Sequence, residues 1–166
     1  MTNRDLQIQQ IIEQNPGIQF REIMRSSGLK NGVLSHYLGK LEKNGIIKAN
    51  RGPRQVRFYP PQITEPESII IKALRKQTPR DLLLALIEND GSEFSELVKA
   101  VKKSPSTVSL YLSQLVDDEL VEIKFVHLKK RYHIKARDII DKLIEDYRPS
   151  ILEKSTSGFE DIFNSF

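Results

Sequence analysis

The sequence predicts a mainly α-helical protein with small β-hairpins (class α+β), in which one unit occurs twice before a helical C-terminal segment. Three observations predict this class: an internal repeat at a fixed spacing, apolar residues at helical spacing within each copy, and breaks of Gly, Pro or Asn between the apolar runs. The chain has 166 residues, which is room for two small domains.

The repeat is visible in two pairs of segments. Residues 17–23 match residues 91–97 at a Gly, a Phe and a Glu, and residues 33–41 match residues 107–115 at a Ser, a Tyr and two Leu. Both pairs are 74 positions apart. Because non-apolar positions coincide as well as apolar ones, we infer that one supersecondary unit is present twice.

In the first repeat, apolar residues at helical spacing predict three helices, and helix breakers separate them. We expect the helices around Leu6–Ile12, Phe20–Met24 and Leu34–Leu41, with breaks at Asn15–Gly17, Gly28–Asn31 and Asn44–Gly45. We expect two strands, Ile46–Lys48 and Val56–Tyr59, around a hairpin tip at Arg51–Arg54. The predicted order is helix, helix, turn, helix, hairpin.

The second repeat has the same predicted order. Thr78–Asp81 is typical of a helix start, with Thr78 as the N-cap, a proline at the first helical position and an acid three residues after the cap. Ser104-Pro105 predicts the start of the third helix in the same way. The helix cores are expected at Leu83–Ile87, Phe94–Val98 and Val108–Leu115, and the strands at Val121–Val126 and Arg131–Ile134.

These elements predict a first domain over residues 1–60, a linker over 61–67, a second domain over 68–135 and a helical segment over 136–166. The prolines of residues 60–66 favour a stiff extended linker, and Ser68–Gln77 is expected to be a connecting helix.

The C-terminal segment is expected to join two copies into a homodimer, because its apolar residues exceed what two small domains need. A helix broken at Pro149 places Ile139, Ile140, Leu143, Ile144 and Tyr147 on one side, and Phe159, Ile162, Phe163 and Phe166 follow at helical spacing. The alternative is that this segment packs back on its own chain.

Composition excludes several classes of function. With no cysteine, the chain has no disulfide framework, thiolate metal site or cysteine nucleophile. The longest apolar run, Leu82–Ile87, is far shorter than the roughly 20 residues a membrane span needs, and residues 1–6 lack a signal-peptide core, so we expect a cytoplasmic protein. We find no phosphate loop, nucleophile elbow or HExxH motif, so we expect no enzyme activity and no cofactor.

Both repeats resemble known DNA-binding domains. Residues 15–47 resemble winged helix-turn-helix domains and are similar to the MarR/ArsR-like domains common in archaeal transcriptional regulators. Residues 72–122 resemble the ArsR group. The resemblance implies a DNA-binding transcriptional regulator whose third helix enters the major groove and whose hairpin, the wing, contacts the backbone or minor groove. ArsR metal sensors typically use a cysteine pair, which this chain lacks.

In the first domain, the outward residues of the third helix have side chains that read bases or phosphates. We predict DNA contacts from Asn31, Ser35, His36 and Lys40. The wing lies in a window without acids between Glu42 and Glu65, which suits it to a narrow, electronegative minor groove. We predict wing contacts from Lys48, Arg51, Arg54 and Arg57.

The second domain offers a weaker DNA surface. Its third helix presents uncharged side chains, of which Ser106, Thr107 and Ser109 are the predicted contacts, and Asp117–Glu119 follows at its end. Its wing is basic, and we predict contacts from Lys124, Lys129, Lys130 and Arg131. We therefore expect the first domain to dominate DNA affinity and the second to assist it or to serve assembly.

The net charge of +4 conceals an uneven distribution, because residues 1–66 carry +5 and residues 136–166 carry −3. The three histidines of the chain do not lie near Asp, Glu or other His residues at the spacing of metal ligands, so no metal site is predicted. The alternative to a DNA-binding regulator is a tandem winged-helix module that docks other proteins within a larger complex.

Overall fold

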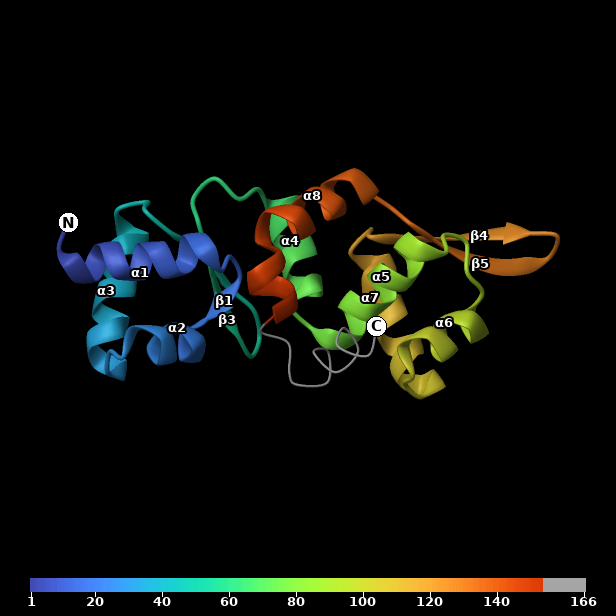
Figure 1. Cartoon of the computed structure of the whole chain (residues 1–166), viewed down its shortest axis with the longest axis horizontal. Helices are drawn as coiled ribbons and strands as arrows, with labels where there is room; N and C mark the ends of the chain where they lie inside the picture. Colours follow the sequence, from blue (N-terminus) through green and yellow to red (C-terminus); the bar gives the residue numbers. More distant parts are fainter. Residues whose placement is uncertain (154–166) are drawn as a thin grey trace. The chain divides into compact units, whose positions relative to one another are not determined.

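The computed structural model describes residues 1–153 and contains two compact units (Figure 1). Of the described residues, the first unit comprises Met1–Ser68 and Tyr147–Glu153, and the second unit comprises Ile69–Asp146. The predicted α+β class is confirmed, with helices accompanied by small antiparallel sheets in each unit. The apolar residues expected at the C-terminal end, Phe159, Ile162, Phe163 and Phe166, lie outside the described residues.

The three helices expected in the first unit are present as α1 (Asn3–Gln14), α2 (Phe20–Ser27) and α3 (Asn31–Lys43). Capping boxes begin α1 and α2, and Gly28 ends α2 with a φ of 71°, a backbone conformation that glycine adopts without strain. One side of each helix is buried in a common core, whose fully or nearly fully buried members are Ile8, Ile12, Ile18, Ile23, Leu34, Leu38, Leu41, Ile47 and Phe58.

The first sheet differs from the prediction in two ways. It has three strands in the order β1-β3-β2, with β1 at Ile18–Gln19, β2 at Lys48–Arg51 and β3 at Val56–Tyr59. The two-residue β1 was not predicted, because it is too short to show an alternating pattern. The expected strand at Ile46–Lys48 was wrong: the chain still turns at Gly45, whose φ is 71°, and β2 begins only at Lys48.

The expected linker was wrong in its second half, because helix α4 (Glu65–Leu74) begins there rather than at Ser68. Thr64 and Glu67 form reciprocal hydrogen bonds, from the Thr64 N–H to Glu67 Oε1 at 3.1 Å and from the Glu67 N–H to Thr64 Oγ1 at 3.2 Å. This pair starts the helix, and Pro66 is tolerated in its first turn, where backbone N–H groups have no helical acceptor.

Helix α5 (Gln77–Glu88) opens the repeat within the second unit, and its expected start was also wrong. Lys76 rather than Thr78 is the N-cap, so Thr78, Pro79 and Arg80 lie buried in the first turn. The proline fits there for the same reason as Pro66.

The remaining elements of the second unit are close to prediction. Helices α6 (Phe94–Val101) and α7 (Pro105–Asp117) precede a two-stranded sheet of β4 (Val121–Val126) and β5 (Lys129–Ile134). Ser104 caps α7 by accepting a hydrogen bond from the Thr107 N–H, with Pro105 at the first helical position, as predicted. Strand β5 begins two residues earlier than expected, because the hairpin turns within His127-Leu128 alone.

Helix α8 (Arg137–Arg148) follows, with a kink at Tyr147, and Pro149–Glu153 forms a π-helical turn. Its apolar residues Ile140 and Leu143 are buried within the single chain, as is Ile151 in the turn. Among residues 1–153, no helix is both long and apolar enough to cross a membrane.

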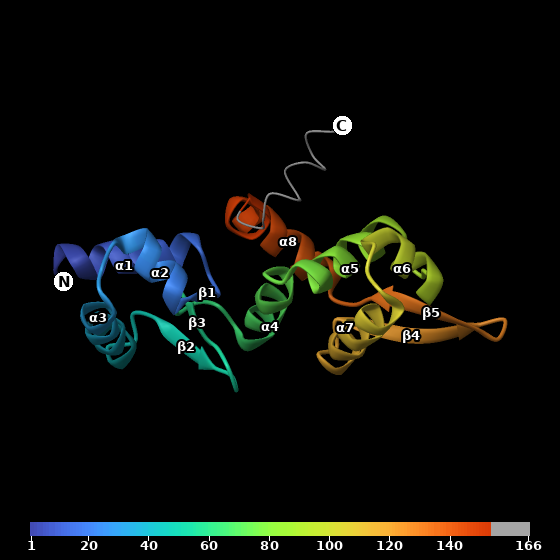
Figure 2. The same cartoon turned by 90° about the horizontal axis from the view of Figure 1, so that it is seen from below.

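In both units one arginine ties the wing to the turn after the first helix of the repeat. The Arg57 guanidinium donates to the Gly17 carbonyl at 2.8 Å, and the Arg131 guanidinium donates to the Gly91 carbonyl at 3.0 Å. Backbone bonds accompany them, because the N–H groups of Gly17 and Gly91 donate to the facing carbonyls of the same wing strands. Figure 2 shows the second wing, β4–β5, beside α7 of the same unit.

We predict that Arg57→Ala lowers the free energy of unfolding by about 2 kcal/mol, because it removes a charged hydrogen bond from a buried carbonyl. Urea denaturation measures this loss. Arg54→Ala, at the exposed tip of the same wing, is the matched control and should change stability by less than about 0.5 kcal/mol. Equal effects of the two substitutions would contradict the structural role of Arg57.

Candidate nucleic-acid interface

The exposed face of α3 carries the polar side chains expected there. Asn31, Ser35 and His36 are exposed, whereas Leu34, Leu38 and Leu41 are buried on the opposite side. Ser35 Oγ donates to Asn31 Oδ1 at 3.3 Å, and the His36 ring packs edge-on against the ring of Tyr37. Because a short, polar helix face of this kind matches the edges of base pairs, these three side chains form one candidate surface.

Lys40 lies on the same face but is engaged within the unit. Its Nζ is 3.1 Å from Oδ2 of Asp5, and the Asp5 residue is fully buried in α1. The same oxygen accepts hydrogen bonds from the backbone N–H and hydroxyl of Thr2. Lys40 therefore balances an internal carboxylate, a role that the sequence reading missed.

The environment of Asp5 favours its ionised form. The pKa of Asp5 is lowered mainly by the hydrogen bond from the Thr2 backbone N–H, and Lys40 lowers it further. Burial raises the pKa, but by less than these interactions lower it. The carboxylate thus stays charged and continues to hold Lys40 at neutral pH.

The first wing, the hairpin Lys48–Tyr59, presents fewer free cations than the sequence predicts. Arg51 donates two hydrogen bonds of 2.7 Å to the Glu42 carboxylate on α3, which lowers the pKa of Glu42. The predicted contact at Arg57 is corrected, because this residue is only 6% exposed and burial lowers the pKa of its guanidinium. Arg54, at the exposed tip between β2 and β3, keeps the predicted position.

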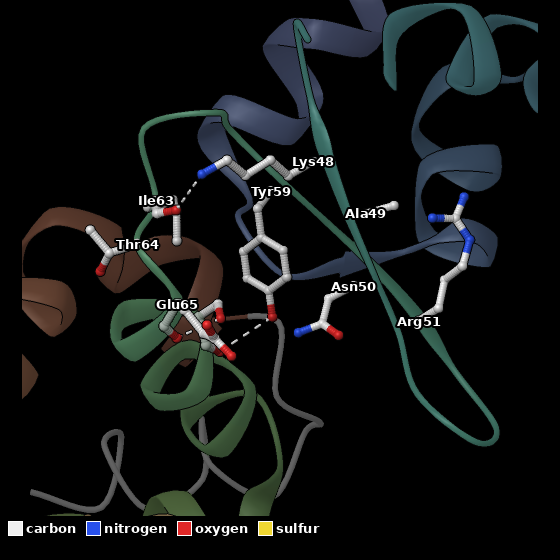
Figure 3. Close-up of a pocket in the computed structure, with 9 residues that line it drawn as sticks. Lys48, Ala49, Asn50, Arg51, Tyr59, Ile63, Thr64 and Glu65 are labelled. Atoms are coloured by element: carbon white, nitrogen blue, oxygen red, sulfur yellow. Dashed lines mark hydrogen bonds between the residues drawn. The ribbon is translucent and has the colours of Figure 1, made fainter. Parts of the chain in front are cut away.

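Lys48 lies at the base of the wing and faces a cavity of about 300 Å³ (Figure 3). Its Nζ donates to the Ile63 carbonyl at 3.1 Å, and the Tyr59 hydroxyl donates to the Ser68 carbonyl at 3.3 Å. These bonds join the wing to the start of α4. Lys48 therefore supports the wing from behind rather than extending its outer surface.

Two cations next to the helix-turn-helix were not among the predicted contacts. Lys30 is the exposed N-cap of α3, and Arg25 is exposed in the last turn of α2. Their place beside the turn at Gly28 was a usable signal, because phosphates commonly lie near the start of a recognition helix.

The second unit presents a different surface. Ser106 and Ser109 are exposed, but Thr107 is half-buried and takes part in the cap of α7. Each predicted wing cation has a partner. The Lys124 Nζ is 3.3 Å from Glu122 Oε1, and both Lys129 Nζ and Arg131 Nη2 are 3.6 Å from Glu93 Oε1. The Lys130 ammonium lies over the Tyr132 ring. Arg131, like Arg57, also has the structural bond to a glycine carbonyl.

Among residues 1–153, His, Asp and Glu side chains do not gather in groups of three or more. The one notable pair is Asp90 and His133, which are 3.3 Å apart. Burial raises the pKa of Asp90, but the hydrogen bonds from the Ile134 N–H and the His133 ring outweigh it and lower the pKa. This pair, like the glycine contact of Arg131, fastens β5 to the turn after α5.

A part of each unit matches a known protein family. Residues 1–48 match the family described as winged helix-turn-helix DNA-binding, and residues 76–122 match the bacterial regulatory protein, arsR family. These matches confirm the resemblance of the two repeats and support a DNA-binding transcriptional regulator. The comparison with curated proteins gives no match.

Three solved structures are similar to parts of this chain. A MarR family transcriptional regulator from Silicibacter pomeroyi is 20% identical over 60% of this chain and 73% of its own, with a TM-score of 0.42. BpsR from Bordetella bronchiseptica, whose DNA binding is regulated by 6-hydroxynicotinic acid, is 12% identical. The match covers 79% of this chain and 88% of BpsR, with a TM-score of 0.42. The DIP2311 protein from Corynebacterium diphtheriae is 19% identical. The match covers 80% of this chain and 26% of DIP2311, with a TM-score of 0.32.

We predict that stability falls at acid pH through Asp5. Because its pKa in the folded protein lies below the ordinary value of 3.8, its contribution is complete above that value and is lost as pH falls through the folded pKa. Urea denaturation between pH 5 and about pH 2.5 should show a shallower acid loss in Asp5→Asn than in the unaltered protein. Parallel curves would show that Asp5 does not contribute.

Proposed function

We propose that this protein, a MarR/ArsR-like protein with two winged helix-turn-helix domains, is a sequence-specific transcriptional regulator that reads double-stranded DNA mainly through its first domain. The observation that carries the proposal is the exposed face of α3, where Asn31, Ser35 and His36 stand together on a helix anchored by a buried core. In domains of this type such a helix enters the major groove.

Each side chain has a matching partner on DNA. Asn31 offers an amide that pairs with adenine, and the Ser35 hydroxyl and the His36 ring both donate and accept hydrogen bonds. The Ser35–Asn31 bond of 3.3 Å holds the two side chains together before DNA arrives. Because such contacts depend on base identity, we assign sequence specificity to this face.

Affinity comes from the cations around that face. Arg54 at the wing tip is placed for the backbone or a narrow minor groove, and Lys30 and Arg25 flank the turn before α3. Arg51 and Lys40 contribute less, because Glu42 and Asp5 already balance their charges. Arg57 is left out of the proposed contacts, because it is buried.

The second domain assists DNA binding or serves assembly. Its exposed serines and its wing lysines remain candidate contacts, but α7 presents no basic side chain and ends in the exposed acids Asp117 and Asp118. Leu110 is 56% exposed in the middle of the same helix. These features favour the alternative function, protein docking, for this domain alone.

We further propose that the protein is a cytoplasmic homodimer and not an enzyme, since regulation by occupying DNA requires no chemistry. The dimer contact is assigned to the C-terminal segment. Because Ile140, Leu143 and Ile151 are buried within one chain, the apolar residues left for this contact are the exposed Ile139, the half-buried Ile144 and those after Glu153.

We predict that Arg54→Ala/Lys30→Ala weakens DNA binding more than Lys129→Ala/Lys130→Ala does. Each lost phosphate contact should reduce the slope of log K against log salt by about 0.9. Titrations of a selected duplex over a salt series measure both effects. A larger loss from the second pair would assign the main DNA contact to the second domain.

Sequence specificity has a separate test. His36→Ala should reduce the preference for the selected duplex over a scrambled one, because it removes a proposed base contact, while leaving the salt slope nearly unchanged. Arg25→Ala is the matched control, because a phosphate contact weakens binding to both duplexes equally. Failure of the unaltered protein to bind any duplex at about 50 mM salt would overturn the proposed function.

A further inference from the structure

The spacing of 74 residues that relates the two repeats extends through both wings. Arg51 pairs with Val56 in the first wing, and Phe125 pairs with Lys130 in the second, so the strands have the same register at the same spacing. Arg57 and Arg131, which bond to the glycine carbonyls, are also 74 positions apart. The outer surfaces of the two domains can therefore be compared position by position.

This comparison shows that the second domain replaces polar and basic positions with apolar ones. Leu110, Phe125 and Leu128 stand where the first domain has His36, Arg51 and Arg54. Even the Glu42–Arg51 ion pair has an apolar counterpart, because Val116 stands in place of Glu42. The exposed fractions of Leu110, Phe125 and Leu128 are 56%, 72% and 99%.

The surface formed by Leu110, Ile123, Phe125 and Leu128 is here named the apolar wing face; Val126 is also exposed but lies on the other side of β4. Its tip is held in an unusual backbone conformation, because His127 and Leu128 both have positive φ, at 51° and 66°. Two-residue turns of this kind normally use Asn or Gly, which adopt positive φ with less strain. Leu128 is thus fully exposed in a backbone conformation that leucine disfavours. Strained backbone and exposed apolar side chains are both common where a residue binds another molecule.

The second wing also has an open edge. One edge of β5 pairs with β4, and its other edge forms a single bridge, from Tyr132 to Ser92. In the described part of the chain, no strand pairs with the outer edge of β4. Edges of this kind accept another chain. Three lysines, Lys124, Lys129 and Lys130, surround the apolar side chains and make the hairpin basic overall.

The described chain stops at Glu153, and the 13 residues that follow have the complementary composition. Four of them are large apolar residues, Phe159, Ile162, Phe163 and Phe166. Two acids, Glu160 and Asp161, lie between the first two of them. A segment rich in apolar residues and containing acids complements a surface of apolar side chains next to lysines.

We propose that residues 154–166 of one copy dock on the apolar wing face of a second copy. The aromatic residues would cover Phe125 and Leu128, and Glu160 and Asp161 would meet Lys130, which lies directly opposite Phe125 on β5. This inference rests on the proposed homodimer and names the surface that receives its C-terminal segment. It assigns DNA reading to the first domain and assembly to the second.

Duplex DNA is the less favoured occupant of this face. Lys43 of the first domain corresponds to Asp117 in the second, and Asp118 and Glu119 follow it at the end of α7. Phosphates in a groove occupied by α7 would meet these acids without any basic residue on the helix to offset them.

The absence of cysteine permits a direct test in the full-length protein, with Ile123→Cys on the apolar wing face and Asn164→Cys in the tail. Mild oxidation of this double variant should give a disulfide-linked dimer several-fold faster than Ala100→Cys/Asn164→Cys, whose first cysteine lies on the exposed side of α6. The single-cysteine variants measure links between like positions. A rate equal to that of the control would overturn the proposal.

A second measurement separates docking from the other functions. Phe125→Ser/Leu128→Ser should weaken dimerisation roughly 30-fold by sedimentation, as truncation of a central aromatic contact does, with the affinity of each first domain for DNA unchanged at matched dimer fraction. Loss of DNA affinity with unchanged dimerisation would make the face a DNA contact and overturn the proposal. A disulfide formed within one chain would support docking of the tail but overturn its exchange between copies.

The two proposals fail in different ways. If the protein binds no duplex but the wing and tail cysteines still link two copies, the assembly surface stands and the regulatory function falls. If DNA is bound specifically but the link forms no faster than in the control, the regulatory function stands and the docking falls.

Discussion

The arrangement of each domain depends on one interaction, the bond from a wing arginine to the glycine carbonyl at the turn after the first helix of the repeat. Arg57 and Gly17 make it in the first domain, and Arg131 and Gly91 make it in the second. The wing is a short hairpin with little core of its own, and an isolated hairpin is at best marginally stable in water. By fastening its second strand to the helical body, the arginine fixes where the wing tip stands relative to the recognition helix.

Charge balance then decides which cations remain free for a partner. In the first domain, buried Asp5 holds Lys40 and Glu42 holds Arg51, so Arg54 and the lysine at the start of α3 carry more of the proposed electrostatic contact. In the second domain, Glu93 stands where the first has Gln19 and lies near two wing cations. One fold therefore presents a polar, basic face in one copy and an apolar face in the other.

Much of the fold was predictable, because the helices have long apolar stripes and explicit breaks. The errors fell where a local motif competes with tertiary context. Thr78-Pro79 reads as a helix start, but the helix begins earlier at Gln77 and buries these residues. The two residues of β1 form a strand only because β3 lies beside them, and no local pattern reveals a strand of that length.

The sequence by itself determined the repeat, the order of elements in each copy and the polar outer face of α3, because periodic apolar residues decide which side of a helix is buried. Only the tertiary structure decided which basic residues are accessible. Arg54 and Arg57 are three positions apart in one acid-free window, yet one is exposed at the tip and the other is buried against Gly17. The reason is physical: a count of charges does not reveal the distant acid or carbonyl that satisfies each one, and those partners are brought together only by folding.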